Sequence, residues 1–365
     1  MAAQDAVELL LHLKLAFLAG EPPACVLALA RKAGGGSITP HVQHFILENC
    51  TGTNLEGRQN CTYTKTILKR IITEFELSSE VVIDELYEEF AQRMLSKAKD
   101  PLLNKADHMY KEISFISSSD DSTSPGLVSM VARLSCSSNM LEGDTGCSLW
   151  PSSLFLSEFI LSYPKIFSKK CCLELGSGVG LVGICLNHIA ASKVILTDGD
   201  SSTLTNMKEN MELNNLCVDE GEDPKLLDEH TNKIECKYLS WEEVSESDLR
   251  GFQPDIVLGA DIIYDPICVP HLVRVLSMML RRDGDQGQTN GRSVDEFVTE
   301  GPIAYIATVV RNVDTFNCFG KAAADAKLSV VNITSDAAPA NFLPYMLSYD
   351  RSSVQLLRIT SVIEH

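Results

Sequence analysis

The chain has 365 residues, of which 45% are hydrophobic and 22% charged, enough for one large hydrophobic core together with a smaller module. Its formal net charge is -18 and its isoelectric point is near 4.9. So acidic a surface repels phosphate backbones, whose binding relies on clustered Lys and Arg, and we expect no nucleic-acid partner. A basic protein segment or a small molecule suits this charge better.

The cysteines and the apolar segments indicate the compartment of the protein. None of the twelve cysteines forms a C-x-x-C pair or a Cys/His cluster with zinc spacing, so we expect no metal, reduced thiols and a cytoplasmic protein. The apolar stretch at 9–20 follows Asp5 and Glu8 and contains Lys14, which favours an amphipathic helix over a signal peptide. No apolar run approaches the roughly 18 residues of a membrane span, so we expect no membrane contact.

Residues 1–110 read as a helical module. Val82, Leu86, Phe90 and Met94 recur at intervals of four residues within 79–97, and similar spacing occurs near 4–19, 41–49 and 64–75. The module contains no chemical constellation. It either docks a large substrate or stabilises the rest of the chain, and both interpretations remain open.

A short segment at 111–140 is expected to link this module to the remainder. The polar stretch SSSDDSTSPG (117–126) separates two extended segments, EISFI (112–116) and LVSMVARLS (127–135). Pro and Gly at its end indicate a turn, so the segment is predicted to be a linker or a β-hairpin.

Residues 141–365 alternate short apolar runs with helical patterns. The predicted strands are CCLEL (171–175), KVILT (193–197), IECKYL (234–239), DIVLGA (255–260), IAYIATVV (303–310), LSVVNIT (328–334) and VQLLRIT (354–360). Such alternation predicts an α/β fold with a seven-stranded, mostly parallel Rossmann-like sheet covered by helices on both faces. The last two strands lack a helical pattern between them and are expected to pair antiparallel. Polar stretches at 218–230 and 282–297 are predicted surface insertions without chemistry.

A glycine-rich turn, ELGSGVG at 174–180, follows the first predicted strand. Gly176, Gly178 and Gly180 would leave backbone amides unobstructed between this strand and a helix starting near Val179. In open α/β sheets, ligands bind at this carboxyl edge. The spacing is tighter than the dinucleotide fingerprint G-x-G-x-x-G, and glycines can also serve as simple tight turns.

The flanking carboxylates narrow the ligand class. Asp198 ends the second predicted strand 22 positions after Gly176, where a carboxylate can accept hydrogen bonds from ribose hydroxyls. Both a nicotinamide cofactor and S-adenosylmethionine present such a ribose. Glu174, beside the loop, would oppose a pyrophosphate but tolerate a sulfonium cation, which favours S-adenosylmethionine.

A second motif makes a family resemblance specific. The segment PDIVLGADIIYDP (254–266) brings Ala260, Asp261 and Tyr264 to the same edge of the sheet. Together with ELGSGVG, Thr-Asp at 197–198 and LSW at 239–241, it resembles the seven-strand protein-lysine methyltransferases that carry an Asp-x-x-Tyr signature. It is most similar to the branch that methylates translation elongation factor 2, whose members add a helical N-terminal module. The motifs cover roughly residues 140–350.

The resemblance implies roles for individual residues. Trp150 would lie against the cofactor, the loop of Glu174, Gly176, Ser177, Gly178 and Gly180 would hold its methionine portion, Asp198 its ribose, Trp241 its adenine, and Ala260 would contact it through the backbone. Asp261 and Tyr264 match the signature itself and are the predicted catalytic residues. Both tryptophans of the chain fall on these positions.

Two further matches leave alternatives open. Arg311, after the strand at 303–310, either lines the pocket or lies on the surface. Leu343-Pro344-Tyr345 resembles a late Phe-Pro-Tyr segment, but Leu replaces the Phe, which leaves a substrate contact there in doubt.

The resemblance thus implies an S-adenosylmethionine-dependent protein-lysine methyltransferase, monomeric and acting on elongation factor 2. Asp261 and Tyr264 would position the amine and would not act as a strong base, because a carboxylate raises the pKa of a neighbouring lysine. Methylation of another protein or a small molecule, a nicotinamide-dependent oxidoreductase, and a non-catalytic binding module are the alternatives.

Overall fold

The computed structural model describes residues 2–52, 61–78, 81–95, 108–117, 127–137, 145–219, 233–281 and 301–362. Contacts divide the chain into two compact units. The first comprises Met1–Asp144 and Asn341–Tyr349, and the second comprises Thr145–Ala340 and Asp350–His365. Nine residues from the C-terminal third, 341–349, therefore pack with the N-terminal helices.

The first unit begins with α-helices. They are α1 Ala2–Leu18, α2 Pro23–Ala33, α3 Pro40–Ile46 with a π-helical turn at Leu47–Thr51, α4 Cys61–Ser78 and α5 Asp84–Leu95. The helical spacing near 4–19, 41–49, 64–75 and 79–97 predicts four of them. Helix α2 was not predicted, since Pro22-Pro23 reads as a break. Pro23 in fact occupies the first turn, where its missing N–H is no loss.

A β-hairpin and the segment 341–349 complete this unit. Strands β1 His108–Ser117 and β2 Leu127–Ser137 pair antiparallel, as the two predicted extended segments suggest. The Tyr345 hydroxyl accepts a hydrogen bond from the Ser114 backbone N–H at 2.8 Å. The buried Glu21 carboxylate accepts two more from Ser348, at 2.8 Å from its N–H and 2.6 Å from its hydroxyl. These contacts fix residues 341–349 within the first unit.

The second unit contains a seven-stranded sheet with the order β5-β4-β3-β6-β7-β9-β8. Its strands are β3 Cys171–Leu175, β4 Lys193–Asp198, β5 Lys233–Tyr238, β6 Ile256–Ala260, β7 Ile303–Val309, β8 Leu328–Asn332 and β9 Val354–Ser361. The first five are parallel, while β9 runs antiparallel to both β7 and β8. The predicted sheet and its antiparallel last pair are confirmed.

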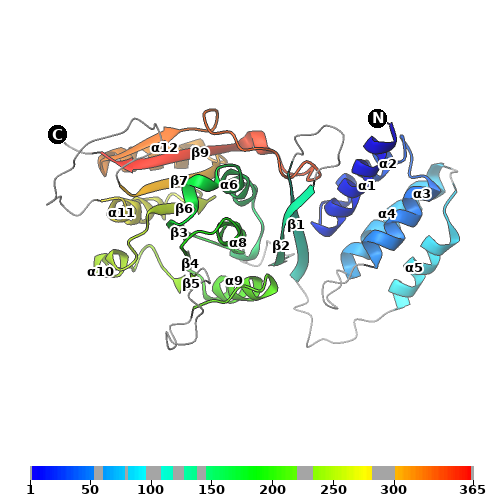
Figure 1. Ribbon diagram of the computed structural model, residues 1–365, viewed down its shortest axis with the longest axis horizontal. Helices are drawn as coiled ribbons and strands as arrows, with labels where there is room; N and C mark the ends of the chain where they lie inside the picture. Colours follow the sequence, from blue (N-terminus) through cyan, green and yellow to red (C-terminus); the bar gives the residue numbers. More distant parts are fainter. Residues whose placement is uncertain are drawn as a thin grey trace. The chain divides into compact units, whose positions relative to one another are not determined.

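Helices cover both faces of this sheet (Figure 1). The group α6 Pro151–Ser162, α8 Leu181–His188 and α9 Ser201–Leu213 lies on one face, and α10 Glu246–Arg250, α11 Val269–Met279 and α12 Val313–Asp325 lie on the other. The short helix α7 Pro164–Phe167 follows α6, and 3-10 turns occur at Thr145–Cys147 and Arg351–Ser353. Leu173 and Val257 pack with Leu272, Leu276 and Phe319 in the larger core.

The strand order creates a switch point beside β3. From β3 the chain proceeds to β4 and β5 on one side of the sheet, and then to β6 and β7 on the other. Ligands of open α/β sheets bind outside the carboxyl ends of the strands at such a point. The glycine loop after β3 and the ADIIY segment after β6 both reach this edge.

Some expectations fall partly or wholly outside this description. The predicted turn at 117–126 and the predicted insertions at 218–230 and 282–297 lie outside the described residues, apart from Ser117, Val218 and Asp219. Within the described ranges, no helix is both long and apolar enough to cross a membrane, and no cluster of His, Cys, Asp or Glu could hold a metal ion.

Candidate active site

The loop between β3 and α8 requires glycine for two separate reasons. Gly176, Gly178 and Gly180 have φ angles of 63°, 53° and 81°, in the left-handed region that L side chains rarely adopt. A Cβ on Gly176 would also lie 2.9 Å from Cγ2 of Ile262. The loop therefore presents bare backbone to its surroundings, and the helix begins at Leu181, two residues later than predicted.

Hydrogen bonds tie this loop to the end of β4. The Gly178 N–H donates to the Asp198 carboxylate at 3.1 Å. The Ser177 backbone N–H donates to the Thr197 carbonyl at 2.9 Å, and the Ser177 hydroxyl accepts from the Thr197 N–H at 3.0 Å. The predicted methionine loop and the predicted ribose carboxylate thus form one hydrogen-bonded structure, although 20 residues separate Gly178 from Asp198.

Glu174 lies just beneath this loop, and its side chain is buried. Among the described residues, its Oε2 has no hydrogen-bond partner. Burial raises the pKa of Glu174 well above its ordinary value, the nearby Ser177 hydroxyl opposes the rise, and the charge of Asp198 adds to it. A buried carboxyl with one unbonded oxygen favours a cationic ligand nearby, because a cation would compensate the cost of its ionisation.

Trp241 packs against the glycine loop at Gly176. It follows β5 and is half-buried against the core that contains β3 and α11. A Cβ on Gly176 would lie 3.5 Å from Cζ2 of its indole, so the ring packs directly over the loop. Arg274 of α11 donates to the Trp241 carbonyl at 2.7 Å, which holds the backbone of this segment in place.

Asp261 follows β6 in an unusual backbone conformation. Its φ angle is 56°, and its N–H donates to the Ala307 carbonyl of β7 at 2.8 Å, continuing the sheet register of Ala260. Its carboxylate Oδ1 accepts from the Val309 N–H at 3.0 Å. The left-handed turn directs the side chain toward the exit of β7, where it is 5% exposed.

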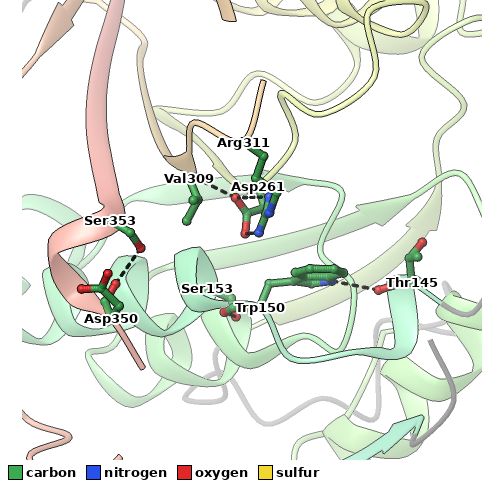
Figure 2. A network of polar contacts seen from close by, with 8 residues as sticks. All are labelled: Thr145, Trp150, Ser153, Asp261, Val309, Arg311, Asp350 and Ser353. Carbon is green, nitrogen blue, oxygen red and sulfur yellow. Dashed lines mark hydrogen bonds and ion pairs between the residues drawn. The ribbon is translucent and has the colours of Figure 1, made fainter. Parts of the chain in front are cut away.

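Arg311 supplies the charge partner of Asp261. Its Nη1 and Nη2 donate to Oδ1 and Oδ2 of Asp261 at 3.2 and 3.0 Å, a paired arrangement that fits a guanidinium to a carboxylate. The guanidinium also lies 5.0 Å from the ring centroid of Trp150. Figure 2 shows the guanidinium beside the Asp261 carboxylate and the Trp150 ring. Arg311 is exposed, with 44% of its side chain accessible, and is also paired with Asp261.

Trp150 is fixed at the start of α6. Its indole Nε1 donates to the Thr145 carbonyl at 2.9 Å (Figure 2). Its own carbonyl accepts from the Ser153 backbone N–H at 3.1 Å and from the Ser153 hydroxyl at 2.8 Å. The carbonyl of Gly146, close before it in sequence, would be 3.0 Å from a Cβ on Gly178. The segment 145–150 therefore connects the glycine loop with the Arg311 and Asp261 pair.

The remaining predicted residues differ in how deeply they are buried. Ala260 is the half-buried last residue of β6, and the Tyr264 side chain is 62% exposed after it. Tyr345 is fully buried in the first unit rather than exposed to a substrate. Arg311 and the Val309 N–H are the site groups that sequence reasoning left undecided or missed. The available signal was the position of Arg311 as the first charged residue after β7.

Comparisons with known proteins find similarity to lysine methyltransferases. A family model described as lysine methyltransferase matches residues 131–286. An uncharacterized protein of Dictyostelium discoideum is 36% identical over 230 residues, and the match covers 59% of this chain and 58% of that protein. Protein-lysine N-methyltransferase EEF2KMT of Bos taurus is 28% identical over 306 residues, covering 82% and 80%. Protein-lysine N-methyltransferase EFM3 of Saccharomyces cerevisiae is 25% identical over 270 residues, covering 67% and 70%.

The matched residues include the loop after β3, the ends of β4 and β6, and helix α11. These are the elements that hold the glycines, Asp198, Trp241 and Asp261. Motif, fold and relatives therefore agree that the chain is similar to the lysine methyltransferases.

Proposed function

We propose that this protein is an S-adenosylmethionine-dependent methyltransferase and that it methylates a lysine of translation elongation factor 2. The observation that carries the proposal is the 306-residue alignment with bovine EEF2KMT, which is too long to lie within the second unit alone. Similarity to this relative therefore extends into the first unit. The net charge of -18 suits a basic protein segment as substrate.

The residues around the glycine loop fit S-adenosylmethionine. The left-handed glycines pack so closely against Ile262, Gly146 and Met211 that none has room for a Cβ, and the orphaned Oε2 of Glu174 lies near the loop. We propose that Gly176, Ser177, Gly178 and Gly180 hold the methionine portion, with Glu174 supplying a compensating negative charge. A pyrophosphate would instead add negative charge beside a buried carboxyl.

The nucleoside portion is assigned to the neighbouring strand ends. Asp198 ends β4 at the place where carboxylates accept hydrogen bonds from ribose hydroxyls. Its Oδ1 and Oδ2 already accept hydrogen bonds from the N–H groups of Asp200 and Gly178, and each retains a further lone pair. Trp241 offers an indole face beside the same loop for adenine. Trp150 and the Ala260 backbone complete the proposed cofactor contacts.

The chemistry places two demands on the protein. When bound, the methyl donor would supply an electrophilic methyl group to a neutral amine, with an uncharged thioether as the leaving group. The protein must align the acceptor amine, and the amine must lose a proton, which costs about 4 to 5 kcal/mol at neutral pH for a reference pKa of about 10.4. We assign alignment to Asp261 and Tyr264. Asp261 is held by Val309 and Arg311, and the exposed Tyr264 lies where a protein substrate can reach it.

Intact-mass analysis of elongation factor 2 tests the substrate. Purified enzyme and methyl donor should raise the mass of the factor in steps of one methyl group, and peptide mapping should place the gain on a lysine. A matched reaction with Asp261→Asn enzyme should give no gain. If radiolabel passes instead to a different protein band of a cell extract, or to a small molecule, elongation factor 2 is the wrong substrate. The predicted cytoplasmic location and monomeric state belong to the same proposal.

A further inference from the structure

The guanidinium of Arg311 has a carboxylate on one side and an aromatic ring on the other. It donates twice to Asp261, at 3.0 and 3.2 Å, and it lies 5.0 Å from the ring centroid of Trp150. The Asp261 side chain is 5% exposed, whereas that of Arg311 is 44% exposed. The carboxylate is therefore enclosed, and the cation closes it off from the solvent side.

The other titratable and charged groups near this edge are mainly acidic. They are Glu174 on β3, Asp198 on β4, Glu242 and Glu243 after β5, Tyr264, Asp265 and Cys268 after β6, and Asp314 at the start of α12, with His271 and Arg274 on α11. Arg274 is engaged by the Trp241 carbonyl. In the described part of the chain, Arg311 is the cation placed against Asp261.

Pairing of the Asp261 carboxylate with a cation affects the pKa of a lysine amine placed nearby. An unpaired carboxylate within about 4 to 6 Å of an amine raises the pKa of that amine by about 1 to 3 units. A bare Asp261 would therefore stabilise the ammonium form of the acceptor, which cannot attack the methyl group. Paired with a guanidinium, the same carboxylate can still accept a hydrogen bond while its charge is offset.

We propose that Arg311 is a positioning residue of methyl transfer, which offsets the charge of Asp261 so that the acceptor lysine loses its proton at neutral pH. The inference rests on the proposed function in one respect, the placement of the acceptor amine near Asp261. Trp150 holds the guanidinium from its other side, and the Trp150 indole is itself anchored to Thr145. The segment that leads into α6 thus sets the orientation of the ion pair.

Arginine has two features here that can be separated. Its charge offsets Asp261, and its planar fork fits both carboxylate oxygens while its face stacks on an indole. Arg311→Lys keeps the charge but loses the fork, whereas Arg311→Gln loses the charge and keeps a hydrogen-bond donor. The charge function predicts different pH profiles for the two variants.

The first test compares analogue binding and needs no protein substrate. Sinefungin carries an amine in place of the methylsulfonium group, whereas S-adenosylhomocysteine is uncharged at that position. Titration calorimetry gives the ratio of the affinity for sinefungin to the affinity for S-adenosylhomocysteine. In Arg311→Gln this ratio should be about tenfold higher than in wild type, since a shift of one pKa unit in the amine corresponds to a tenfold change in affinity. Arg311→Lys and the double variant Asp261→Asn/Arg311→Gln should keep the wild-type ratio. An unchanged ratio in Arg311→Gln would overturn the inference.

The second test is the pH profile of kcat for methylation of elongation factor 2. The alkaline rise of kcat should move upward by about one pH unit or more in Arg311→Gln, with activity recovering at high pH. In Arg311→Lys, kcat should fall by a similar factor at every pH. A uniform loss in Arg311→Gln would indicate a merely structural role and contradict the inference. If wild-type enzyme does not methylate elongation factor 2, the proposed function fails, and the analogue ratio still decides the role of Arg311.

Discussion

The backbone N–H of Gly178 donates to the carboxylate of Asp198 at 3.1 Å, which joins the tip of the glycine loop to the end of β4. Burial raises the pKa of Asp198, while backbone N–H donors, that of Gly178 first, oppose the rise. The shape of the loop and the state of the carboxylate therefore depend on each other. A change in the loop backbone should alter the proposed ribose contact as well.

Gly178→Ala should weaken binding of S-adenosylmethionine. The left-handed φ of 53° costs an L residue about 1 to 2 kcal/mol, which corresponds to a loss of roughly tenfold in affinity if the loop shifts to relieve it. The new Cβ would also lie 3.0 Å from the Gly146 carbonyl. Titration calorimetry with the methyl donor measures the effect.

Gly320→Ala is the matched control for that substitution. Gly320 lies in α12, and a Cβ there would meet no atom within 4 Å. Alanine in a helix interior is favoured over glycine by about 0.5 to 1 kcal/mol, so this variant should melt slightly higher and bind the methyl donor normally. Equal affinity of both alanine variants for the methyl donor would show that the loop does not hold it.

Glu174→Gln should change how stability depends on pH. Because the pKa of Glu174 is raised in the folded state, the folded protein keeps a proton that the unfolded chain loses above about pH 4.3. The contribution of Glu174 to stability is thus fully present below the unfolded pKa and is lost as pH rises toward the folded pKa. Glutamine does not titrate, so the variant should gain stability relative to wild type as pH increases.

Thermal melts of the two ligand-free proteins between about pH 5.5 and about pH 8 check this sign. The difference in melting temperature, variant minus wild type, should grow with pH. Parallel curves would mean that Glu174 titrates alike in the folded and unfolded states. Binding of the cationic donor should favour the ionised carboxylate, so wild-type affinity should rise with pH while that of Glu174→Gln should depend on pH less steeply.

Asp261→Asn should abolish most methyl transfer with little effect on folding. Asparagine tolerates the φ of 56° and can still accept from the Val309 N–H, but it removes the charge that orients Arg311. Misplacement of the amine by about 1 Å can cost about 100-fold in kcat. Asp261→Ala should lose activity as well, and it should also lower the free energy of unfolding by about 1 to 3 kcal/mol because Val309 loses its acceptor. Full activity of the asparagine variant would disprove the role of Asp261.

Tyr345→Phe should destabilise the first unit. The hydroxyl of this fully buried residue accepts from the Ser114 N–H, and its removal leaves a buried donor unpaired, at a cost of about 1 to 3 kcal/mol. Urea unfolding of the full chain measures the loss. Tyr264→Phe serves as the comparison, since that side chain is 62% exposed and its loss of a hydroxyl should leave stability unchanged. Equal stability of the two variants would contradict the burial of segment 341–349.

Much of the second unit was predictable because its signals are local. The strands of a parallel sheet are buried on both faces, so β3, β4 and β7 appear in the sequence as short continuous apolar runs. The glycine spacing after β3 marks a turn that other residues cannot form. Helix α2 could not be predicted, because two consecutive prolines indicate the end of a helix unless they are known to lie at its start.

Long-range pairing could not be read from the sequence. Arg311 lies 50 residues after Asp261 and was equally compatible with the surface, because nothing local to TVVRN specifies a partner. Tyr345 carries no sign that it packs against Ser114, which is 231 positions away. The register of β6 against β7 brings the first pair together, and the packing of 341–349 onto the hairpin brings the second.

The sequence by itself determined the kind of sheet, the glycine turn after β3 and the carboxylates at the ends of β4 and β6, because backbone conformation and strand burial restrict residue type position by position. Only the tertiary structure decided that Asp261 pairs with Arg311, whose guanidinium lies over Trp150, and that residues 341–349 belong with the N-terminal helices. Those arrangements depend on contacts between segments far apart in the chain, and hydrogen bonds and ion pairs of that kind leave no periodic pattern in the residues that form them.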